Sequence, residues 1–143
     1  MHFTTLEAED AQGYSAYATG GMTKGVTVRE MTASFQIFGN GGMYYKPYTY
    51  FKVVDRNGKV LLDNENQVPT QAISSQTATI MNRLLRTVVT SGTGTPANIS
   101  GWDIFGKTGT TDNNNDSWFV GGSPYAVAGT WIGYKIPESI PYY

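Results

Sequence analysis

A cation, two hydroxyl groups and a residue without a side chain follow one another at Lys107, Thr108, Gly109 and Thr110, inside an otherwise strand-like segment. The lysine ammonium and the threonine hydroxyls could hold a carboxylate through charge-assisted hydrogen bonds. Gly109, and Gly106 before it, would let another backbone approach, so that an extended peptide could pair with the strand edge. A lysine on an edge strand also prevents aggregation, and on these residues alone both interpretations stay open.

The sequence lacks the residues that several other kinds of catalytic site require. It contains no cysteine, and its single histidine, His2, cannot form a histidine-based zinc site or a Ser-His-Asp triad. None of the nine serines is followed three positions later by a lysine, and none begins a Ser-x-Asn triplet. We therefore expect no activated serine nucleophile within this sequence.

Two further motifs have ordinary structural interpretations. Residues 112–116 alternate Asp and Asn as a calcium loop does, but the sixth position is Ser117 instead of glycine and the twelfth is Ser123 instead of glutamate. A solvated hairpin loop is favoured. The triplet at 92–94, Gly-Thr-Gly, lacks the continuation of a phosphate-binding loop and is interpreted as a helix end. No metal ion or cofactor is expected.

The overall charge argues against a polyanionic partner. Ten Lys plus Arg and eleven Asp plus Glu give a formal net charge of −1, without a basic run, so no nucleic-acid partner is expected. No segment approaches the roughly 20 apolar residues that a membrane-spanning helix needs. We expect the chain itself to be soluble.

Two helices are predicted beside the strand. Thr27 and Glu30 form a capping box, and apolar residues then recur at spacings of three and four, which predicts a helix over 27–38. Ser74 or Ser75 can cap a second helix, which is predicted over 75–90. Its wide apolar stripe consists of Ile80, Met81, Leu84, Leu85 and Val88.

The remaining pattern is that of β-structure. An Asn-Gly turn signal between two runs of strand-forming residues predicts a hairpin within 48–62. Strands are predicted over 104–110, 118–121 and 126–134, and short loops make them antiparallel neighbours. Residues 1–26 have weak periodicity and are predicted to be irregular. The fold class is therefore α+β, with an antiparallel sheet that ends in the 107–110 edge and packs against the two helices.

The order of motifs resembles that of the penicillin-binding proteins. The residues that carry the resemblance are Gly-Lys-Thr-Gly-Thr-Thr at 106–111 and Asp-Ser-Trp-Phe-Val-Gly at 116–121, and it continues upstream to about residue 13. The second motif, together with Gly-Thr-Trp-Ile-Gly at 129–133, resembles the class A proteins, which combine a transpeptidase with a glycosyltransferase. In this family a Lys-Thr-Gly element works with Ser-x-x-Lys and a serine-containing triplet.

The resemblance implies a penicillin-binding/β-lactamase-like transpeptidase fold and a role for each matching residue. Lys107 would position the serine network, and Thr108 and Thr110 would bind the carboxylate of a D-alanyl-D-alanine stem peptide or of a β-lactam. Gly109 would lie in the same substrate-binding strand, and the backbone N–H of Thr110 would be an oxyanion donor. The parent protein is expected at the extracytoplasmic face of the bacterial plasma membrane, anchored in it.

The sequence departs from the family because both serine motifs are absent. We therefore expect residues 1–143 to form a single partial domain, the C-terminal part of a transpeptidase domain, which is inactive without its N-terminal half. A sheet that lacks the N-terminal strands would have an open edge, at which two copies could associate. The alternative is a non-catalytic module that binds cell-wall peptides or assists assembly.

Overall fold

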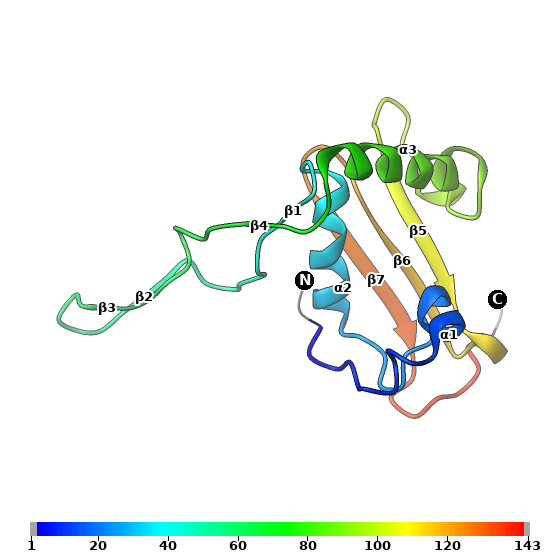
Figure 1. The fold of residues 1–143 in the computed structure, drawn as a ribbon, viewed down its shortest axis with the longest axis horizontal. Coiled ribbons are helices and arrows are strands. Elements are labelled where there is room, and N and C mark those ends of the chain that lie inside the picture. The colour runs from blue at the N-terminus through cyan, green and yellow to red at the C-terminus, as the bar shows by residue number, and fades with distance from the viewer. Residues whose placement is uncertain (1–2, 142–143) are drawn as a thin grey trace.

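A three-stranded antiparallel sheet forms the centre of the computed structural model, which describes residues 3–141 (Figure 1). Strand β5 comprises Phe105–Thr110, β6 comprises Asp116–Gly122 and β7 comprises Val127–Gly133. The strand order is β5-β6-β7, so β5 is an edge strand. The three predicted strands and their antiparallel pairing are confirmed, and only their ends differ by one or two residues.

Helix α2, Val28–Phe35, contacts β6 and β7, and a 3-10 turn over Gln36–Phe38 continues it. The cap is the predicted one, because the Thr27 hydroxyl accepts a hydrogen bond from the Glu30 amide at 3.2 Å. The predicted helix over 27–38 is therefore confirmed as an α-helix with a tighter last turn.

Helix α3, Ser75–Ser91, lies across one end of the sheet and contacts β5 (Figure 1). Ser74 caps it by accepting a hydrogen bond from the Thr77 amide at 3.1 Å. The predicted apolar stripe was partly wrong, since Ile80 and Leu84 are 59% and 55% exposed. The buried face is rotated from them because the core lies on one side of the helix only, and it consists of Ala78, Leu85 and Val89.

A two-stranded arm projects from the body of the molecule (Figure 1). Its strands are β2, Lys52–Val54, and β3, Val60–Asp63, which confirm the predicted hairpin. The Asp55 carboxylate accepts the amides of Asn57 and Lys59 at 2.8 and 2.9 Å and so fixes the turn. All four residues of β3 are exposed, so the arm has no apolar core of its own.

Several short elements of the described chain were not predicted, among them two strands, one α-helix and the 3-10 turns Thr95–Ala97 and Asp112–Asn114. The strands β1, Met43–Tyr44, and β4, Thr70–Gln71, pair at the base of the arm, and two-residue strands are too short for a period-two pattern. The prediction of irregular structure over 1–26 was wrong at helix α1, Tyr14–Thr19, which buries no residue and hence has no apolar periodicity. Residues 1–2 lie outside the described residues.

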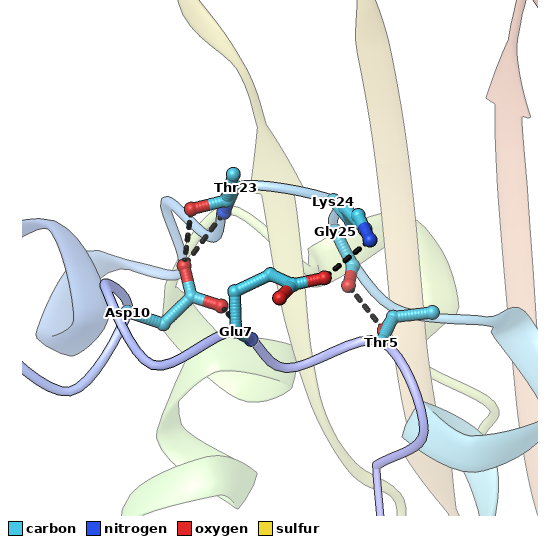
Figure 2. A network of polar contacts seen from close by, with 6 residues as sticks. All are labelled: Thr5, Glu7, Asp10, Thr23, Lys24 and Gly25. Carbon is cyan, nitrogen blue, oxygen red and sulfur yellow. Dashed lines mark hydrogen bonds and ion pairs between the residues drawn. The ribbon is translucent and has the colours of Figure 1, made fainter.

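The segment before α2 is anchored by two buried carboxylates, and Figure 2 shows the first, Asp10. Asp10 accepts the Glu7 amide at 2.8 Å and both the amide and the hydroxyl of Thr23 at 2.7 Å. These hydrogen bonds, the Glu7 amide first, hold the pKa of Asp10 below its ordinary value of 3.8. Hydrogen bonds from the Thr4 side chain and then from Thr27 likewise lower the pKa of Glu30.

A candidate substrate-binding strand

The predicted site residues lie together on β5, at one edge of the sheet. In an antiparallel ladder, residues alternate between pairs that hydrogen-bond to each other and pairs that do not. The Thr111 amide donates to the Asp116 carbonyl across the turn at 3.2 Å, so these two residues form a hydrogen-bonded pair. Counting back along β5, Thr110 with Ser117 and Thr108 with Phe119 are then pairs that do not hydrogen-bond to each other. The backbone N–H and C=O groups of Thr108 and Thr110 therefore face away from β6, toward the open edge.

Lys107 extends its ammonium along this same edge. Its Nζ atom donates a hydrogen bond to the Thr108 carbonyl at 2.8 Å, and its side chain is exposed. The ammonium thus occupies a backbone acceptor that an added strand would otherwise use. This placement fits both interpretations from the sequence, because the lysine covers the unpaired edge and its ammonium lies where a carboxylate bound at that edge could reach it.

The two glycines of the strand have different roles. A Cβ atom on Gly106 would lie 2.6 Å from the Phe119 ring of β6, so packing within the sheet is by itself a reason for glycine at this position. A Cβ atom on Gly109 would meet the Trp118 Cβ at 3.4 Å, which is an ordinary contact. For Gly109 no such packing requirement exists, and its predicted role of leaving space for another backbone stays a prediction.

The turn after the strand is fixed by a compact polar cluster. The Asp116 carboxylate accepts the Trp131 indole N–H at 2.8 Å and the Thr111 hydroxyl at 3.1 Å. The Thr111 hydroxyl in turn accepts the Asp116 amide at 2.8 Å. Within residues 3–141 no group of three or more His, Cys, Asp or Glu side chains could hold a metal ion. The three hydrogen bonds of the cluster hold the C-terminal end of β5 in place.

An open cavity of about 360 Å³ adjoins β5. Its wall includes Thr108, Phe119 and the segment after α3, which contributes Thr93 and Gly94. The hydroxyls of Thr93 and Thr108 lie 2.6 Å apart. Sequence reasoning missed Thr93, although the Gly-Thr-Gly triplet that contains it was visible.

Comparison with known proteins places these features in one family. A family model described as the penicillin-binding protein transpeptidase domain matches residues 7–137. Penicillin-binding protein 1A of Aquifex aeolicus is 39% identical over 132 residues, which are 92% of this chain and 18% of that protein. Penicillin-binding protein 4 of Bacillus subtilis is 40% identical over 141 residues, which are 99% of this chain and 22% of the relative.

Solved structures agree with the sequence relatives. The penicillin-binding protein PonA1 of Mycobacterium tuberculosis superposes with a TM-score of 0.71 at 27% identity, over 83% of this chain and 32% of that one. The D,D-transpeptidase domain of a peptidoglycan glycosyltransferase from Eggerthella lenta gives 0.60 at 37% identity, over 77% and 27% of the two chains.

The sheet, its helices and the Lys-Thr-Gly edge strand define part of a transpeptidase domain of the β-lactamase-like fold. The chain belongs to the penicillin-binding protein transpeptidase family. The predicted likeness to class A proteins is confirmed by relatives named penicillin-binding protein 1A, and the alternative of a non-catalytic module is not favoured. The chain spans about a fifth of the length of the curated relatives described above.

Proposed function

We propose that this chain supplies the substrate-binding edge of a serine D,D-transpeptidase that cross-links peptidoglycan. The observation that carries the proposal is the position of the Lys-Thr-Gly motif on an edge strand, with the backbone groups of Thr108 and Thr110 directed outward. A stem peptide that ends in D-alanyl-D-alanine, or a β-lactam, would lie along this edge as an additional strand.

The four residues at 107–110 have the following roles in this proposal. The hydroxyls of Thr108 and Thr110 bind the substrate carboxylate, and the Lys107 ammonium adds charge-assisted attraction and positions the serine network. The outward N–H of Thr110 is available as an oxyanion donor, a kind of group whose removal typically costs about 10²–10³ in rate. Gly109 leaves space for the ligand backbone.

The nucleophile comes from another part of the complete penicillin-binding protein, because this sequence has no Ser-x-x-Lys motif. The complete protein acts outside the plasma membrane, anchored in it, where peptidoglycan is assembled. Within the described residues, no helix combines the length and the apolar character that spanning a membrane requires.

The chain by itself is expected to form no covalent adduct with penicillin. Acyl transfer needs an activated hydroxyl beside a base, and no serine here has a lysine one helical turn further on. Non-covalent affinity should be no better than about millimolar, since one wall of the cleft is absent. Intact-protein mass spectrometry after incubation with excess penicillin measures this, with the complete penicillin-binding protein as the positive control. A stoichiometric adduct on one of the nine serines of this chain would contradict the proposal.

The opposite edge of the sheet is proposed to be a pairing surface. Strand β7 has no second strand partner among residues 3–141, and its side chain of Ile132 is 57% exposed. An open edge with apolar side chains favours pairing with another strand. In the complete protein that strand comes from the N-terminal half of the domain, and in the isolated chain from a second copy. Sedimentation velocity is expected to show self-association that increases with concentration, and a strict monomer at high concentration would contradict it.

A further inference from the structure

The turn that follows α3 holds Thr93 in a fixed position. The Val88 carbonyl accepts hydrogen bonds from the Gly92 amide at 3.1 Å and from the Gly94 amide at 2.9 Å. The residues on both sides of Thr93 are thus bound to one acceptor in the last turn of the helix. Such a closed turn leaves Thr93 little backbone freedom, although its side chain is exposed.

Close packing explains why glycines flank Thr93. A Cβ atom on Gly92 would lie 2.9 Å from the Val88 Cα, and one on Gly94 would lie 3.2 Å from the Val88 Cγ1 and 3.4 Å from the Phe119 ring. The turn therefore lies directly against α3 and β6. The Gly-Thr-Gly triplet does more than end the helix, because it presents one hydroxyl to the sheet at a set place.

That hydroxyl meets the substrate-binding strand. The Oγ1 atoms of Thr93 and Thr108 lie 2.6 Å apart, although the residues are 15 positions apart in the sequence. A hydroxyl has one proton to donate and two lone pairs that can accept. If Thr108 donates its proton to a substrate carboxylate, its oxygen can bond to Thr93 only as the acceptor, so Thr93 must be the donor.

We propose that Thr93 is a positioning residue that directs the Thr108 O–H toward the substrate carboxylate. This inference rests on the proposed function of β5. The hydrogen bond from Thr93 fixes the rotamer of Thr108 and leaves its proton free to point away from Thr93, into the open cavity that both residues line. In the resulting series, Thr93 donates to Thr108 and Thr108 donates to the carboxylate, and each bond polarises the next.

The test uses the complete penicillin-binding protein and the variants Thr93→Val and Thr93→Ser. Valine keeps the branched shape and removes the hydroxyl, whereas serine keeps the hydroxyl. Stopped-flow acylation separates the dissociation constant of the initial penicillin complex from the rate constant of acylation. Thr93→Val is expected to weaken the initial complex by about 3- to 10-fold, the range of one neutral hydrogen bond, with a smaller change in the rate constant. Thr93→Ser should bind within about twofold of the parent.

Two further measurements separate positioning from a general structural effect. In a Thr108→Val background, the additional change Thr93→Val should have no effect, since the group through which it acts is absent. Penicillin methyl ester, which lacks the free carboxylate, should react equally with the parent and with Thr93→Val.

The outcomes distinguish this inference from the proposed function. Unchanged binding by Thr93→Val, additive effects of the two valines, or equal losses with the ester would each overturn the role of Thr93. If Thr108→Val itself leaves penicillin binding unchanged, the proposed role of the strand fails as well. Loss with Thr108→Val and none with Thr93→Val would reject the positioning role alone.

Discussion

Replacing Lys107 with alanine in the complete penicillin-binding protein is expected to slow acylation by penicillin by about 10- to 100-fold. A hydrogen bond to a charged group contributes about 1.5–3 kcal/mol, and the ammonium lies at the edge where the carboxylate would bind. The fold should remain intact, because the exposed side chain bonds only to the neighbouring Thr108 carbonyl among the hydrogen bonds and ion pairs described. Time courses of labelling with a fluorescent penicillin measure the change.

Lys59→Ala is a matched control for this variant. Lys59 is also exposed, but it lies in the turn between β2 and β3. The arm that these two strands form extends away from β5 (Figure 1). Its replacement should leave the acylation rate unchanged. Equal rates for Lys107→Ala and the parent would show that Lys107 is only a surface charge that protects an edge.

The change Gly121→Ala is expected to destabilise the domain by about 3 kcal/mol, near the upper end of the usual cost of overpacking. Gly121 faces Gly106 in the register of β5 and β6. A Cβ atom at this position would lie 2.9 Å from the Gly106 Cα and 3.1 Å from the Phe119 ring, and would also overlap the Phe105 carbonyl oxygen. Because two of these neighbours are backbone atoms, β5 itself would have to shift.

Gly109→Ala, on the same pair of strands, is the control for stability. Its Cβ would make only ordinary contact with Trp118, so the free energy of unfolding of this variant should lie within about 0.5 kcal/mol of the parent's. Chemical denaturation followed by tryptophan fluorescence compares the two variants. Equal midpoints for Gly121→Ala and Gly109→Ala would show that the sheet adapts without cost and that the close approach of β5 and β6 is not essential.

Local signals in the sequence were sufficient for most of the fold. The cap at Thr27 and the Asn-Gly turn of the hairpin each depend on a few neighbouring residues and were correctly located. The cap of the second helix was narrowed to two serines, of which Ser74 is the one that accepts the hydrogen bond. The edge position of residues 107–110 was also predicted, since short loops order three strands uniquely when each pairs with the next.

The features that the sequence did not predict depend on contacts between residues far apart in the chain. The hydrogen bond between the Thr93 and Thr108 hydroxyls joins two segments that only the packing of α3 brings together, so no local pattern reveals it. The same holds for Gly106, whose missing side chain makes space for Phe119 on the next strand. The exposure of Ile80 and Leu84 likewise depends on which side of α3 faces the sheet.

The projecting arm makes its main contacts between its own two strands. Its separation from the sheet affects which sequence changes the molecule can tolerate. A substitution that alters β2 or β3 has few neighbours through which to disturb β5. Sequence can therefore diverge in the arm, and its turn at residues 55–59 can be lengthened or can carry an inserted tag, at little cost to the sheet. The arm is the part of this chain in which new surface properties can be acquired independently of the substrate strand.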